Sequence, residues 1–148
     1  MNQGIMSRQP AASAGFTLVE MMITIVIVAI LSALALPAYN DYITRSRIPQ
    51  ATSNLSAMRV RLEQFYMDNR TYVGACTAAL LPPADDFTYA CPTLTATAYT
   101  VTATGGAKMT NFTYSIDHLN ARKTTNLPDT KWGTAPVNCW VIRKGGGC

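Results

Sequence analysis

The stretch that decides the fold runs from Phe16 to Leu36 and reads FTLVEMMITIVIVAILSALAL. Its 21 residues carry a single charge, Glu20. A helix rises about 1.5 Å per residue, so the run covers roughly the 30 Å thickness of a bilayer core. The whole chain is 49% hydrophobic and only 14% charged, which is low for a soluble domain. Residues 16–36 are therefore predicted to form a transmembrane helix.

A short polar segment, residues 1–15, precedes the apolar run, and Arg8 is its only charged residue. A basic leader without acidic residues favours a cytoplasmic N-terminus with the following chain outside. Translation can start at either Met1 or Met6, because both starts leave Arg8 in the leader. A secretory signal peptide cut after Ala33 or Ala35 is the alternative, although the apolar run here is longer than such peptides need.

A second helical segment is predicted after Pro37, over residues 37–70, where the chain turns polar but keeps helical periodicity. Six apolar residues at steps of three and four form one stripe, which must pack on something: Ile48, Ala51, Leu55, Met58, Leu62 and Phe65. Arg59, Arg61, Glu63 and Gln64 are assigned to the solvated face. Together the two segments predict one helix of about 50 residues, roughly 75 Å long. Pro37 and Pro49 are expected to bend or locally break it.

The second half of the chain predicts a loop over residues 71–95 and a small antiparallel sheet over residues 96–148. Alternating residues predict a hairpin, with strands at 99–104 and 112–117 joined through Gly105 and Gly106. A third strand is expected at 139–143, with Trp140 and Ile142 on one face, and a weaker one at 121–125. The predicted fold class is α+β, with the sheet packed on the helical stripe.

The most informative motif is Gly15-Phe16-Thr17-Leu18-Val19-Glu20, which leads directly into the apolar run. This combination resembles the N-terminal signature of type IV pilins and related pseudopilins. The resemblance implies a leader of residues 1–15 that a prepilin peptidase removes by cutting between Gly15 and Phe16. It also implies N-methylation of Phe16, and Pro37 matches the position where many pilins carry a helix-bending proline.

A lone carboxylate inside a membrane costs several kcal/mol and is usually functional. The resemblance implies that Glu20 neutralises the Phe16 amine of a neighbouring subunit and so sets register in a filament. The alternative is that Glu20 lies near a helix end and reaches the membrane interface.

Four cysteines, Cys76, Cys91, Cys139 and Cys148, lie in the second half of the chain. Their spacing is not that of a zinc site, and an even number favours disulfides in an oxidising compartment. Three pairings are possible, and nearest-neighbour pairing would join Cys76 to Cys91 and Cys139 to Cys148. The resemblance supports the second bridge in particular, since the ending CWVIRKGGGC is similar to small minor pilins of the type IVa group.

The function that the resemblance implies is structural: a subunit, of minor-pilin type, of a type IV pilus for motility, adhesion or DNA uptake. Its expected partners are other pilin subunits, the prepilin peptidase and the inner-membrane assembly platform. It would span the inner membrane once, with a periplasmic C-terminus, and reach the cell surface after assembly. A type II secretion pseudopilin is an alternative, for which Asp117 and Asp129 could ligate calcium.

The distal part of the chain is selectively basic. Residues 96–148 hold six basic and two acidic residues, whereas residues 16–95 hold five basic and six acidic ones. The six are Lys108, Arg122, Lys123, Lys131, Arg143 and Lys144. Such a balance suits DNA or acidic surface glycans, and a DNA receptor in natural transformation is a second alternative, although an ordinary solvated face has the same composition.

An enzyme is not expected. The chain has one histidine, His118, and no Ser-His-Asp or phosphate-cradling glycine signal, so no catalytic residues, cofactor or metal site are predicted.

Overall fold

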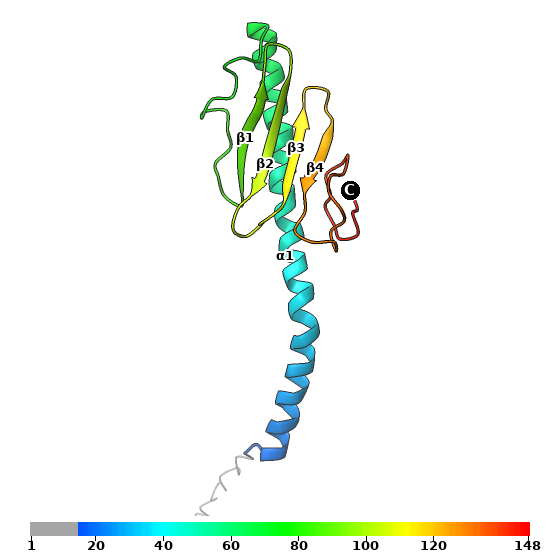
Figure 1. Ribbon diagram of the computed structural model, residues 1–148. Coiled ribbons are helices and arrows are strands. Elements are labelled where there is room, and N and C mark those ends of the chain that lie inside the picture. The colour runs from blue at the N-terminus through cyan, green and yellow to red at the C-terminus, as the bar shows by residue number, and fades with distance from the viewer. Residues whose placement is uncertain (1–14) are drawn as a thin grey trace, which may run out of the picture. The chain divides into compact units, whose positions relative to one another are not determined.

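The computed structural model describes residues 15–148, so the expectations about the leader before Gly15 and the two start methionines lie outside it. One long helix is followed by four strands (Figure 1). The elements are α1 (Leu18–Asn69), β1 (Phe87–Leu94), β2 (Tyr99–Gly105), β3 (Thr113–Asp117) and β4 (Arg122–Asn126). The chain divides into two units, the first ending at Tyr39 and the second covering Asn40–Cys148. This is the predicted α+β class.

Helix α1 is a single helix of 52 residues. Within the described residues it is the one helix long and apolar enough to span a membrane. Its large apolar side chains from Leu18 to Leu36 are all at least half exposed. The helix continues through Pro37 and Pro49, so neither proline breaks it, and the alternative that they bend it stays a prediction. A proline removes one hydrogen bond, and the adjoining turns keep the helix continuous.

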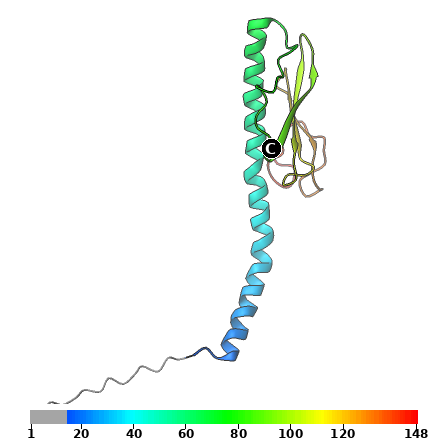
Figure 2. The same ribbon diagram turned by 90° about the vertical axis from the view of Figure 1, so that its left-hand side faces the viewer.

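The core of the second unit lies between α1 and the sheet. Five members of the predicted stripe are fully buried, which confirms its packing role: Ile48, Ala51, Leu55, Met58 and Leu62. Phe65 packs against the same core and is partly buried. From the sheet side, alternate residues of β2 fill the core, because successive side chains of a strand point to opposite faces. Figure 2 shows the sheet lying along one side of this part of α1.

The sheet is antiparallel with the order β1-β2-β3-β4. The predicted hairpin is confirmed, since β2 pairs with β3 through Thr100 with Asp117 and Thr104 with Thr113. Gly105 is required in the connection, because a Cβ there would overlap the Met109 carbonyl. The weaker prediction near residues 121–125 is also confirmed, as β4.

The first correction concerns β1, which lies inside the stretch 71–95 that was expected to be a loop. Pro92 falls within this strand and disguised it, because proline is normally excluded from strand interiors. β1 is an edge strand, and its register with β2 shifts between Ala90 and Thr93. The register shift accommodates Pro92 at the edge of the sheet, so the hydrogen bonds between the interior strands are not interrupted.

The second correction concerns residues 139–143, which form no strand. Trp140 and Ile142 do not share a face, since Trp140 is buried and Ile142 is 43% exposed. Only Val137 pairs with β4 here, through an isolated bridge to Thr124. The rest of the segment is held by side chains, as described below.

The third correction concerns Glu63, which was assigned to the solvated face. Its two carboxylate oxygens accept hydrogen bonds from the Tyr72 hydroxyl at 3.0 Å and the Tyr99 hydroxyl at 2.8 Å. Burial, together with the bond to Glu63, raises the pKa of Tyr72 to about 12. The same causes raise the pKa of Tyr99. Glu63 therefore ties the helix to β2 and to the loop after α1.

Candidate functional site

The residues around the predicted processing site lie at the start of α1. Thr17 caps the helix, because its hydroxyl accepts a hydrogen bond from the Glu20 backbone N–H at 3.2 Å. Phe16 is 74% exposed, and Glu20 lies in the exposed first turn. Thr17 and Glu20 occupy the positions of a capping box, a signal that the motif contains and that our sequence reasoning missed. The pairing of Glu20 with a neighbouring amine stays a prediction.

Two disulfides are present, Cys76–Cys91 and Cys139–Cys148. The first joins the loop after α1 to the edge strand β1. The second closes the C-terminal segment on itself, so that residues 139–148 form one loop. Three of the six predicted basic residues lie in the segment after β4 that contains this loop: Lys131, Arg143 and Lys144.

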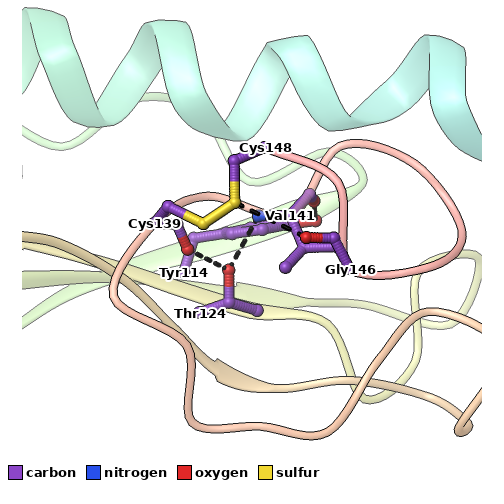
Figure 3. The surroundings of a disulfide bond; sticks show 6 residues. All are labelled: Tyr114, Thr124, Cys139, Val141, Gly146 and Cys148. Carbon is purple, nitrogen blue, oxygen red and sulfur yellow. Dashed lines mark hydrogen bonds between the residues drawn. A yellow bond between two sulfur atoms is a disulfide. The ribbon is translucent and has the colours of Figure 1, made fainter.

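Thr124 of β4 anchors this C-terminal loop (Figure 3). Its side chain is fully buried, and its hydroxyl donates to the Cys139 carbonyl at 2.7 Å and accepts from the Val141 N–H at 2.9 Å. The buried Tyr114 hydroxyl donates to the Val141 carbonyl at 2.8 Å. These bonds take the place of a strand ladder, and sequence reasoning missed them because a threonine in a strand has no distinguishing pattern.

All six predicted basic residues are exposed, but they do not form one cluster. Arg122 and Lys123 begin β4, at the β3–β4 connection. Lys108 lies in the β2–β3 connection, at the other end of the sheet. Between these ends β4 extends over about 13 Å, from the rise of a strand per residue. Five of the six therefore follow β4 and the segment after it, and together with Lys108 we call them the basic edge.

The members of the basic edge differ in how they are held. Lys144 is paired with Asp41 of α1 at 2.6 Å, so much of its charge is already neutralised. Lys131 is tied to the C-terminal loop through its carbonyl, which accepts from the Gly145 N–H at 2.7 Å. The Arg122 guanidinium carbon lies 4.8 Å from the centre of the Trp140 ring.

An open pocket of about 340 Å³ lies where the β2–β3 connection meets the segment after β4. Lys108 and Asp129 line it together with the aromatic rings of Phe112 and Trp132. The two rings meet edge to face with centres 4.9 Å apart. This packing joins the β2–β3 connection, which carries Lys108, to the segment that carries Lys131.

The two acids considered for calcium serve as turn acceptors in separate loops. Asp117 accepts hydrogen bonds from the Leu119 and Ala121 N–H groups, and Asp129 accepts from the Lys131 N–H. Among residues 15–148 no group of three or more potential metal ligands occurs.

Comparison with known proteins gives two family matches. Residues 10–36 match the family described as "Prokaryotic N-terminal methylation motif". Residues 37–121, more than half of the chain, match the family described as "Type IV minor pilin ComP, DNA uptake sequence receptor". Five of the six basic residues follow residue 121 and lie outside this match.

Curated relatives are fimbrial proteins. A "Fimbrial protein" of Pseudomonas aeruginosa is 38% identical over 66 residues, covering 45% of this chain and 43% of the relative. A "Type IV major fimbrial protein FimA" of Dichelobacter nodosus is 42% identical over 74 residues, covering 50% of this chain and 41% of the relative. The chain thus aligns with less than half of the length of these relatives.

A solved structure with the same fold is the non-core minor pilin PilV of Neisseria meningitidis. Its TM-score is 0.54 at 11% identity, over 60% of this chain and 93% of that structure. The fold, the methylation motif and the match over residues 37–121 agree with one another. The chain therefore belongs to the type IV minor pilin family described as the ComP DNA uptake sequence receptor.

Proposed function

We propose that this protein is a minor subunit of a type IV pilus that binds double-stranded DNA through its basic edge. The single observation that carries the proposal is the position of five exposed cations along β4 and the segment after it, with Lys108 exposed in the β2–β3 connection. The description of the matching family names a DNA uptake sequence receptor, which supports DNA as the ligand. Motility and adhesion then become properties of the filament rather than of this surface.

The anchoring of the C-terminal loop supports the same function. A surface that binds a stiff polyanion benefits from cations at fixed positions, because ordering flexible side chains and loops on binding reduces affinity. The Cys139–Cys148 disulfide and the Thr124 hydroxyl hold the loop in place before any ligand arrives. Lys131 and Arg143 would then contact phosphates without prior folding of the loop.

The N-terminal half supplies the route to the cell surface in this proposal. The precursor spans the inner membrane with the apolar part of α1, and a prepilin peptidase cuts between Gly15 and Phe16. Phe16 is N-methylated, and the assembly platform inserts the subunit among other pilins, where Glu20 meets a neighbour's amine. The exposed apolar side chains of residues 18–36 support this role, because they need lipid or partner helices around them.

Salt-dependent DNA binding tests the proposed receptor function. The assay uses the full-length mature protein in nonionic detergent micelles and follows fluorescence anisotropy of labelled 24-base-pair duplexes. The logarithm of the binding constant should fall with the logarithm of salt concentration, with a slope of about −0.9 for each phosphate neutralised. Lys123→Gln should make that slope shallower by about 0.9, while Lys144→Gln should change it less, because Lys144 is paired with Asp41.

Arg70→Gln is the matched control, since Arg70 is an exposed cation just after α1 and outside the basic edge. Its removal should leave the slope unchanged. Equal effects of Arg70→Gln and Lys123→Gln would show that binding follows net charge alone and would remove the basic edge as the site. Binding of heparin with no binding of duplex DNA would point to acidic glycans as the ligand.

Intact mass tests the processing route separately. Protein from sheared surface filaments should begin at N-methylated Phe16 and contain no free thiol. A chain that begins after Ala33 or Ala35 would contradict assembly through this helix.

A further inference from the structure

A second feature of interest is the end of the second unit at which α1 enters it (Figure 1). Segments that are far apart in the sequence meet the first helical turns of this unit there. Lys144 pairs with Asp41, and Lys108 of the β2–β3 connection lines the open pocket together with Thr44. We call this region the entry end. It comprises residues 40–47, 85–86, 106–112, 127–132 and 143–147.

The entry end lies near the membrane boundary when α1 spans a bilayer. Asp41 follows Leu36, the last residue of the apolar run, by five residues in the same helix, which is about 7.5 Å along the helix axis. The polar headgroup layer on each side of the hydrocarbon core is about 5–7 Å thick. Lys144, whose Nζ lies 2.6 Å from the Asp41 carboxylate, is therefore held at the level of the headgroups.

Two exposed aromatic side chains mark the same boundary. Tyr39 and Tyr42 are 62% and 64% exposed and lie about one turn apart on α1. Tyrosine is enriched at membrane–water interfaces, because its ring is apolar and its hydroxyl can hydrogen-bond to water or headgroups. Lipid headgroups around this turn explain why both rings are exposed.

Arg45 is directed toward the same level. In a helix the Cα–Cβ bond tilts toward the N-terminus, and the Arg45 Nε donates to the Asp41 carbonyl at 3.4 Å. Lys108 starts higher, since Thr44 lies about 12 Å beyond Leu36 along the helix. Its long aliphatic stem can carry the ammonium group part of the way to the headgroups, and an average helix tilt of about 20° lowers one side of the entry end further.

The charge balance of the entry end is positive. Its basic residues are Arg45, Arg47, Lys108, Lys131, Arg143 and Lys144, and its acidic residues are Asp41, Asp85, Asp86 and Asp129. Six cations and four carboxylates leave a net charge of +2. Two of the cations are paired, Lys144 with Asp41 and Arg47 with Asp86. Such a surface is attracted to anionic lipid headgroups, and the attraction weakens within a Debye length.

We propose that the entry end docks on the anionic phospholipid surface of the membrane that α1 spans, before the subunit is assembled. Arg45 and Lys108 contact lipid phosphates, and Tyr39 and Tyr42 lie among the headgroups. This inference rests on the membrane-anchored route of the proposed function and adds a lipid contact to it. Docking occupies Lys108, so this cation of the basic edge becomes available to DNA once the subunit leaves the bilayer.

Amide hydrogen exchange in lipid nanodiscs tests the docking. The full-length mature protein is placed in discs of phosphatidylcholine alone and in discs of equal parts phosphatidylcholine and phosphatidylglycerol. Residues 106–112 should exchange more slowly in the anionic discs. Residues 118–121, in the β3–β4 connection at the other end of the sheet, should exchange equally in both. Salt at 1 M reduces the Debye length to about 3 Å and should remove the difference at residues 106–112.

Substitutions then identify the contacting residues. Lys108→Gln and Arg45→Gln should each reduce the slowing by up to about fivefold, because one basic residue near an anionic surface changes the docking equilibrium by about that factor. Lys123→Gln is the matched control, since Lys123 is an exposed lysine at the other end of the sheet. It should keep the slowing of the wild type. Each variant is compared between the two discs, so changes in intrinsic exchange rate cancel.

The outcomes separate this inference from the proposed function. If the protein is retained in neither kind of disc, both the membrane anchoring and the docking are wrong. If it is retained in both and residues 106–112 exchange at the same rate, the docking is refuted while the anchoring and the DNA binding stand. Equal effects of Lys108→Gln and Lys123→Gln would also refute docking through the entry end, because the whole domain would then respond to the surface charge.

Discussion

The substitution Thr124→Val tests how the C-terminal loop is held, because valine has nearly the same shape as threonine and lacks only the hydroxyl. The backbone pairing of residue 124 with Val137 is retained, since it uses main-chain atoms at 2.9 and 3.0 Å. Two hydrogen bonds are lost, one to the Cys139 carbonyl and one from the Val141 N–H. The change therefore isolates the side-chain anchor.

The expected loss of stability follows from how deeply the two groups that lose a hydrogen-bond partner are buried. Val141 is fully buried, so its N–H loses its partner in a place where water cannot replace it, which costs about 1–3 kcal/mol. Cys139 is partly buried, so the loss of the hydrogen bond to its carbonyl costs about 1 kcal/mol. The free energy of unfolding should fall by about 2–4 kcal/mol, the sum of the two.

Urea unfolding of the full-length protein in nonionic micelles measures this change. Both tryptophans of the chain, Trp132 and Trp140, lie in the second unit, so their fluorescence follows that unit and not the apolar helix. Thr125→Val is the control, because the Thr125 hydroxyl is exposed and makes only a 3.3 Å bond to the Thr113 carbonyl. The control should lie within about 0.5 kcal/mol of the wild type.

The reasoning would be refuted if Thr124→Val and Thr125→Val had the same urea midpoint and slope. That result would mean that the disulfide alone positions the loop. A lower midpoint together with a changed slope would indicate an altered unfolded state and would also contradict the simple loss of two bonds.

Two further predictions concern buried tyrosines. Tyr114→Phe should lower the free energy of unfolding by about 1–2 kcal/mol, because it removes a buried hydrogen bond. Tyr42→Phe, at an exposed position, should leave the free energy of unfolding unchanged. Equal effects of the two substitutions would contradict the assignment of a buried hydrogen bond to Tyr114. Burial raises the pKa of Tyr114, and burial together with Glu63 raises those of Tyr72 and Tyr99. The folded state therefore keeps protons that the unfolded state releases near pH 10, so the contribution of these tyrosines to stability should be fully present below pH 10 and should be lost as pH rises through the raised values. Urea midpoints measured from pH 8 to pH 12 check this, and a midpoint that stays level above pH 10 would disprove it.

Much of the fold was predictable because its signals are periodic. The apolar run of residues 16–36 and the stripe from Ile48 to Leu62 repeat over many turns, and the β2–β3 hairpin alternates strictly. Signals of this kind add up over a segment, so a single irregular residue does not hide them. The edge strand β1 escaped prediction because Pro92 and a register shift interrupt its alternation.

The candidate site was predictable in its charges and not in its geometry. The sequence shows six cations in the distal part, but only the structure separates Lys144, paired with Asp41, from Arg122, stacked on Trp140. These partners lie 103 and 18 residues away along the chain. A contact between such distant residues depends on the whole tertiary arrangement and leaves no local pattern.

The sequence by itself determined the membrane-type helix, the processing motif, the helical stripe and the basic character of the distal part, because each depends on residues that are neighbours along the chain. Only the tertiary structure decided that Glu63 is a partner of two tyrosines and that the 139–143 segment is a loop anchored by Thr124. A buried polar group needs a hydrogen-bond partner, and the fold, not the local sequence, determines which group supplies it.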